Sequence, residues 1–144
     1  MRKYHLTYGR PVAYRDFGDV CQGDIGGYVD SEDNLSHDGT CWVYDRARVT
    51  GGARVYGDAK IYDRALITGN AHVFDDARVF ENAVVEGNAI VCGHARIIGA
   101  TVKGNSRCAG DAELHQKETI DKSSKINSRR SPDKKRKRYI ITTG

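Results

Sequence analysis

The chain has 144 residues, of which 39% are hydrophobic and 29% are charged, values that fit one folded domain and argue against a disordered chain. It contains no apolar run long enough to cross a membrane, and the opening MRKYHLTYGR lacks the apolar segment of a secretory signal. The four cysteines form no CxxC pair. This favours reduced thiols and a cytoplasmic protein over a disulfide-stabilised secreted one.

The first 40 residues show no regular period. They contain the glycine-rich segment GDIGGYV and end just before a repeat begins. We expect residues 1–40 to form a cap over the first turn of the structure that the repeat builds.

From residue 41 to 117 a six-residue unit repeats, in which a small residue is followed two positions later by an aliphatic one. Alanine recurs at every sixth position over 47–95, and Val or Ile recurs at every sixth position over 49–97. One residue is deleted after Gly99, and the unit then resumes. A period of six does not fit the 3.6-residue turn of a helix, so the repeat indicates β-structure.

Each unit is typical of a very short strand followed by a corner. Small, variable and aliphatic residues alternate as the two faces of a strand do, and the Gly, Asn and Asp residues that follow tolerate the positive φ of a turn. Three units close a triangle, so residues 18 positions apart stack on one another. The sequence therefore predicts an all-β fold, a parallel β-helix of about four triangular coils with alanine and aliphatic side chains filling the interior.

The repeat resembles that of the hexapeptide-repeat proteins, and this resemblance implies a single-stranded, left-handed β-helix shared with many acyltransferases. The segment RDFGDVCQGDIGGYVDSEDNLSHDGTCWVYD, residues 15–45, is similar to the opening of a bacterial and phage branch labelled as transferases. Acyltransferases of this family use a histidine as general base and a loop that protrudes from the helix. The carbonic anhydrases of the family hold zinc with three histidines. Here no loop interrupts residues 41–98 and no His-x4-His pair occurs, so we expect no metal site and no cofactor.

Five histidines are present, and we single out His72 and His94 as candidate catalytic residues. Asp76 lies four residues after His72 and one predicted coil, 18 positions, before His94. An aspartate beside a histidine can orient it as a general base. The alternative is that all three are ordinary turn and surface residues. His37, in the segment NLSHDG, falls in the expected cap and within the opening that matches the branch.

Stacking in steps of 18 places aromatic residues in two outward columns, one with Tyr44, Tyr62 and Phe80 and the other with Tyr56 and Phe74. Such ladders stabilise neighbouring coils. The other interpretation is an association surface, to which the outward aliphatic residues Leu66, Val84 and Ile90, expected on one side of the prism, would contribute. Because β-helices of the family commonly pack their faces together, the resemblance implies a homo-oligomer, and we expect a trimer.

Residues 118–144 are predicted to form a basic tail. Residues 121–144 hold 9 Lys and Arg against 2 Asp and Glu, whereas residues 1–120 hold 14 against 17. The cluster could bind an anionic partner, and its members are Arg129, Arg130, Lys134, Lys135, Arg136, Lys137 and Arg138. Two alternatives are a disordered solubilising tail and a linker to a last strand in YIITTG.

Two classes of function remain. The unbroken wall favours a non-catalytic oligomeric scaffold or protein-interaction module, of phage origin and acting on a host complex. The alternative is an acyltransferase-like enzyme that takes an acyl-CoA donor at a site between subunits, with His72 or His94 as the base.

Overall fold

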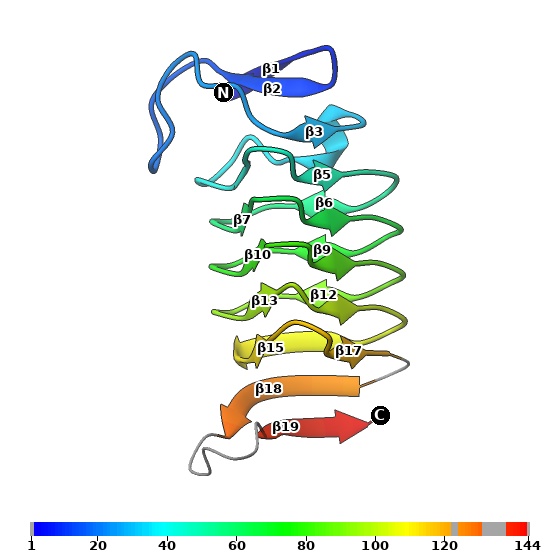
Figure 1. Ribbon diagram of the computed structural model, residues 1–144. Coiled ribbons are helices and arrows are strands. Elements are labelled where there is room, and N and C mark those ends of the chain that lie inside the picture. Colours follow the sequence, from blue (N-terminus) through cyan, green and yellow to red (C-terminus); the bar gives the residue numbers. More distant parts are fainter. Residues whose placement is uncertain (1, 122–123, 131–137, 144) are drawn as a thin grey trace.

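The computed structural model describes residues 2–121, 124–130 and 138–143 and shows a stack of triangular coils, with the N-terminal hairpin at one end and the last strand at the other (Figure 1). The hairpin pairs β1 (Tyr4–Thr7) with β2 (Arg10–Ala13) in antiparallel fashion. A short 3-10 helix, η1 (Glu32–Asn34), precedes the first coil. The described residues contain no helix with the length and apolar character needed to cross a bilayer.

Three parallel sheets form the sides of the stack. The β4 face contains β4 (Trp42–Val43), β7 (Lys60–Ile61), β10 (Arg78–Phe80), β13 (Arg96–Ile98) and β16 (Glu113–Leu114). The β5 face contains β3 (Tyr28–Val29), β5 (Arg48–Val49), β8 (Leu66–Ile67), β11 (Val84–Val85), β14 (Thr101–Val102) and β17 (Thr119–Ile120). The β6 face contains β6 (Arg54–Val55), β9 (His72–Val73), β12 (Ile90–Val91), β15 (Arg107–Asp111) and β18 (Ser124–Arg130), followed by the antiparallel strand β19 (Arg138–Thr143).

The predicted fold class is confirmed, because the protein is an all-β parallel solenoid. It has about five turns rather than about four, since the β4 face alone holds five strands. The alanines over 47–95 and the aliphatic residues over 49–97 are almost completely buried. The six-residue repeat predicted that these residues are buried, because successive side chains of a strand point to opposite faces and only one of the two faces the interior.

The single deletion is visible in the pairing of the strands. Phe80 pairs with Ile98, 18 positions later, whereas Val84 pairs with Thr101, 17 positions later. The corner at Gly99 is therefore one residue shorter than the corners above it, and the interior register is preserved. The predicted position of the deletion is confirmed.

Hydrogen bonds between coils run in one direction along the stack. The amide of Leu66, for example, donates to the carbonyl of Ala83 in the following coil at 2.9 Å. The carbonyls of the first coil consequently point towards the N-terminal end, where no further complete coil supplies donors. Buried carbonyls need partners, so this end of the solenoid requires a cap.

The N-terminal segment supplies a donor to every second carbonyl from residue 41 to 55. Lys3 Nζ donates to the carbonyl of Cys41 at 2.8 Å, and Asn34 Nδ2 donates to those of Gly51 and Ala53 at 3.0 and 2.8 Å. The other donor and acceptor pairs are Gly27 to Val43, Arg10 to Asp45, Tyr28 to Ala47, Asp30 to Val49 and Ser36 to Val55. Side chains and irregular backbone thus replace the missing coil.

The segment GDIGGYV lies directly against the first coil. A Cβ atom on Gly26 would lie 2.5 Å from the carbonyl oxygen of Val43, and one on Gly27 would lie 2.4 Å from that of Ala47. Only glycine fits such a close approach of two backbones. These two glycines allow the cap to hydrogen-bond the coil directly.

Candidate functional site

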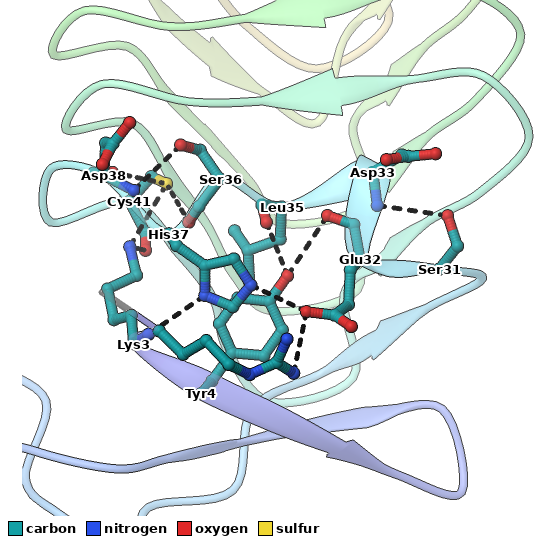
Figure 2. Close-up of polar contacts among 11 residues, drawn as sticks. Lys3, Tyr4, Ser31, Glu32, Asp33, Leu35, Ser36, His37, Asp38 and Cys41 are labelled. Carbon is teal, nitrogen blue, oxygen red and sulfur yellow. Dashed lines mark hydrogen bonds and ion pairs between the residues drawn. The ribbon is translucent and has the colours of Figure 1, made fainter.

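A polar cluster lies where the cap meets the first coil (Figure 2). At its centre Lys3 is completely buried, with Nζ donating to the carbonyls of Gly39 and Cys41 and lying 3.5 Å from the Cys41 thiol. The ammonium also lies 4.7 Å from the centroid of the Phe17 ring. Burial lowers the pKa of Lys3 and raises the pKa of Cys41. A raised pKa keeps the thiol protonated and unreactive at neutral pH.

His37 uses both of its ring nitrogens in this cluster. The backbone amide of Lys3 donates to Nδ1 at 3.0 Å, so in the neutral ring the proton resides on Nε2, which lies 2.8 Å from Glu32 Oε1. The same carboxylate oxygen pairs with Arg2 at 2.9 Å. The hydrogen bond from His37 and the contact with Arg2 lower the pKa of Glu32. This geometry holds the His37 ring in place and leaves it no free nitrogen to act as a base.

Tyr4 is the third main member of the cluster and packs against one face of the His37 ring. The two rings stack with centroids 4.2 Å apart, and the Tyr4 hydroxyl donates to the carbonyl of Leu35 at 2.5 Å. The side chain is fully buried, and burial raises the pKa of Tyr4. In Figure 2 the side chains of Lys3, directly before β1, and Tyr4, the first residue of β1, reach to the loop after η1, so the cluster ties the hairpin to the first coil.

An open groove of about 390 Å³ adjoins this cluster, between η1 with its following loop and strands β6 and β9. His37 and Glu32 line one side, and Arg54, Tyr56 and His72 line the other. With Asp33 also in the lining, the groove brings together two histidines, a tyrosine, two carboxylates and a guanidinium. Of the two histidines in the groove, His72 is the one whose ring keeps a nitrogen without a hydrogen-bond partner among the described residues.

The structure gives the predicted catalytic candidates different partners. His72 Nδ1 lies 3.1 Å from the hydroxyl of Tyr56, and its Nε2 has no hydrogen-bond partner among the described residues. Asp76 lies instead beside His94, with 3.7 Å between Oδ2 and Nδ1, and the two side chains are 54% and 70% exposed. His72 is thus oriented by a tyrosine in a groove, whereas His94 and Asp76 form a loose pair on an open corner.

The predicted interface residues lie on more than one face. Leu66 and Val84 are paired neighbours on the β5 face, whereas Ile90 lies on the β6 face, paired with His72. The expectation that these three aliphatic side chains share one side of the prism is wrong, because each successive unit of six residues turns the chain onto the next face. All three are half-buried.

The aromatic columns form stacked ladders between coils. Tyr62 stacks on Phe80 with centroids 4.7 Å apart, and Tyr56 stacks on Phe74 at 4.8 Å. Tyr44 meets Tyr62 edge to face at 6.2 Å and donates from its hydroxyl to Asp19 at 2.5 Å. The ladders join neighbouring coils, and their role in an interface stays a prediction.

Four of the seven residues of the predicted basic cluster lie outside the described residues. Arg129 and Arg130 belong to β18 and Arg138 to β19, while Lys134, Lys135, Arg136 and Lys137 lie outside the described residues. In β18, Ile126 is fully buried and pairs with Cys108 of β15. Contact with an anionic partner stays a prediction for this segment.

No group of three or more His, Cys, Asp or Glu side chains in the described part of the chain is arranged to hold a metal ion. Sequence reasoning did not identify Lys3, Tyr4, Glu32 or Cys41 as members of a site. Their contacts span 28 to 38 positions of an aperiodic segment, so no repeat or motif signals them. His37 was noted only through the family resemblance.

The six-residue register and the stacked coils together define a hexapeptide-repeat β-solenoid protein. A family model described as the YdcK beta solenoid repeat matches residues 43–57. The chain is also 36% identical over 59 residues to a protein of Escherichia coli (strain K12) named "Uncharacterized acetyltransferase YdcK". The matched region is 40% of this chain and 18% of that protein. The chain therefore spans less than a fifth of the relative's length.

Proposed function

We propose that this protein is a self-associating β-solenoid module that binds other proteins through its flat faces. The observation that carries the proposal is the β5 face, where the half-buried side chains of Leu66 and Val84 lie next to each other on paired strands. Adjacent outward aliphatic side chains on a rigid sheet favour association, because covering them removes apolar surface from water.

The geometry of the prism supports a closed assembly. The β5 face is a row of two-residue parallel strands in register, so it presents a straight surface to a second copy. Copies related by a three-fold axis close into a ring in which no copy of the contact surface stays unpaired. We therefore propose a homotrimer with the β5 face at or near the subunit contact.

Light scattering during size-exclusion chromatography tests this assembly. We expect a mass of three times the 15.9 kDa chain. The double variant Leu66→Glu/Val84→Glu should shift the mass towards that of a monomer, because it places two like charges in the contact. The matched control is Arg96→Glu, which changes an exposed side chain on the β4 face and should leave the mass unchanged. A monomeric native protein would contradict the proposal.

More specifically, we propose that the module is encoded by a phage and that its partner is a protein complex of the host. A pull-down from host lysate with the native protein and with the Leu66→Glu/Val84→Glu variant is the corresponding test. A partner retained by the native protein and lost in the variant would support this form. Equal capture by both proteins would place the contact elsewhere.

A second candidate function is an acyltransferase-like enzyme that uses an acyl-CoA donor. Two observations favour it: the groove in which Tyr56 orients His72 while Nε2 remains available, and the similarity to a protein named as an acetyltransferase. In this hypothesis Nδ1 of His72 donates its proton to the Tyr56 hydroxyl, so the lone pair of Nε2 can act as general base, and a neighbouring subunit completes the site. His94 with Asp76 is the weaker base, because both side chains are mostly exposed.

Calorimetric titration with acetyl-CoA separates the two functions. The enzyme hypothesis predicts binding that is weakened by His72→Ala, with His94→Ala as the matched histidine control on an open corner. The module hypothesis predicts no heat of binding with acetyl-CoA for either the native protein or the variants. Tyr56→Phe provides a further check, since it removes only the hydroxyl that orients His72.

A further inference from the structure

Three arginines surround an open pocket of about 370 Å³ at the corner between the β4 and β5 faces. Arg46 and Arg64 occupy equivalent corner positions one coil apart, and Arg48 begins the adjoining strand β5. Ala65 and Leu66 contribute the apolar part of the lining. The pocket is therefore positively charged at its rim and apolar at its floor.

The neighbouring carboxylates Asp45, Asp63 and Glu81 line an adjoining pocket together with Arg46 and Arg64, but they form no direct ion pair with these guanidinium groups. Asp45 and Asp63 precede Arg46 and Arg64 directly, yet their carboxylates accept hydrogen bonds from backbone amides of the next coil, at 3.4 Å from Asp63 and 3.0 Å from Glu81. Within the described residues, none of the three pocket arginines has a carboxylate oxygen within 4.0 Å. The register of the coils thus holds three guanidinium groups, none of them in a direct ion pair with a described residue, around one pocket.

The register explains why the three side chains have no direct ion-pair partner among the described residues. Each corner begins with a residue at positive φ, Asp45 at 57° and Asp63 at 58°, whose side chain caps the next turn. The following residue is exposed, so Arg46 and Arg64 extend from the corner into solvent. Arg48 lies 6.0 Å from the ring centroid of Tyr28, and Arg10 lies 4.8 Å from the same ring. This aromatic contact restricts the position of Arg48 beside the pocket.

We propose that this pocket binds the phosphate group of a small soluble molecule, as a monoester or a diphosphate. A guanidinium presents a planar fork of donors that fits phosphate oxygens in pairs. Three guanidinium groups match the charge of a phosphate dianion better than that of a carboxylate. The bound anion would relieve the repulsion between the arginines, and Leu66 would contact an apolar part of the ligand.

Calorimetric titration of the full chain with inorganic pyrophosphate, at about 50 mM salt where screening is weak, tests the site. We expect saturable binding that Arg64→Gln and Arg46→Gln each weaken about tenfold, the effect of losing about 1.4 kcal/mol of binding free energy. Arg48→Lys keeps the charge but loses the fork, so it should weaken binding as well. Arg96→Gln is the matched control, since it removes one exposed arginine from the β4 face and should leave the affinity within about twofold.

Three outcomes would overturn the proposal: no binding of pyrophosphate, equal weakening by Arg96→Gln, and binding confined to phosphoinositide vesicles with none to the soluble anion. The pocket borders the proposed trimer contact, because Leu66 belongs to both, but anion binding does not require a trimer. If the protein is monomeric and still binds pyrophosphate through Arg64, the proposed trimer is contradicted and the anion site is supported.

Discussion

The repeated body and the N-terminal cap supply hydrogen-bond donors to the backbone carbonyls of the coils in different ways. In the body, each carbonyl that points along the stack accepts a backbone amide from the neighbouring coil, as Ala83 does from Leu66. In the cap, the equivalent carbonyls of the first coil accept from side chains and irregular backbone, among them Lys3 and Asn34. A periodic element can thus be stable in its middle through its own repeat, but its end needs groups that the repeat does not contain.

The largest effect should come from placing a charge inside the body. Ile67→Asp buries a carboxylate at a fully enclosed position with no partner, which costs several kcal/mol and should unfold the protein. Circular dichroism and thermal unfolding measure this. Arg96→Asp, next to the buried Ile97 but facing outward, is the control and should change stability by less than about 1 kcal/mol. A folded Ile67→Asp variant would contradict the interior assignment.

The next largest loss of stability should follow deletion of the C-terminal end of the stack. Deleting residues 121–144 removes β18, whose fully buried Ile126 pairs with Cys108, and uncovers the edge of β15. We expect a loss of stability of several kcal/mol and a tendency to aggregate, because a free sheet edge pairs with other chains. Thermal unfolding and light scattering are the measurements. An unchanged melting temperature would instead support a dispensable basic tail.

A single side chain of the cap should matter almost as much. Asn34→Ala removes the two donors to the carbonyls of Gly51 and Ala53, and we expect a cost of about 2–4 kcal/mol in the free energy of unfolding. Urea unfolding measures the loss. Asn88→Ala, an exposed asparagine at a corner of the body, should cost less than about 0.5 kcal/mol. Equal costs would show that the cap adds nothing beyond ordinary surface contacts.

The last effect is absent at neutral pH and appears only under alkaline conditions. Burial raises the pKa of Cys108 from 9.0 to about 12, so between these values the unfolded chain loses a proton that the folded protein keeps. The contribution of this thiol to stability is complete below pH 9.0 and falls as pH rises towards about 12. Its slope is about 1.4 kcal/mol per pH unit. Urea unfolding of Cys108→Ala should lack this slope, and identical slopes in both proteins would contradict it.

Much of the body could be predicted from the sequence because each repeat contacts only its neighbours. The register of Ala and aliphatic residues, the corner glycines and the deletion at Gly99 all follow from local periodicity and were confirmed. The faces were less predictable. Residues stack when they are three units apart, as Leu66 and Val84 are, whereas Ile90 follows Val84 by one unit and therefore falls on the next face.

The candidate site could not be predicted in the same way. Lys3 reaches Cys41 across 38 positions and His37 receives the amide of Lys3 across 34, in a segment without a period. The partner of His72 was expected among the nearby aspartates, yet Tyr56 on the preceding coil is the residue that contacts it. Contacts of this kind depend on how a specific loop folds over an open end.

The sequence by itself determined the fold class and the interior, since a six-residue period of small and aliphatic residues allows only short strands with corners that stack. Only the tertiary structure decided which side chains meet at the cap, in the groove beside His72 and in the pocket of Arg46, Arg48 and Arg64. The physical reason is that stacking fixes the spacing of the backbone within the body. At the end of the solenoid and at its corners, side chains contact residues that are distant along the chain, and the repeat does not determine those contacts.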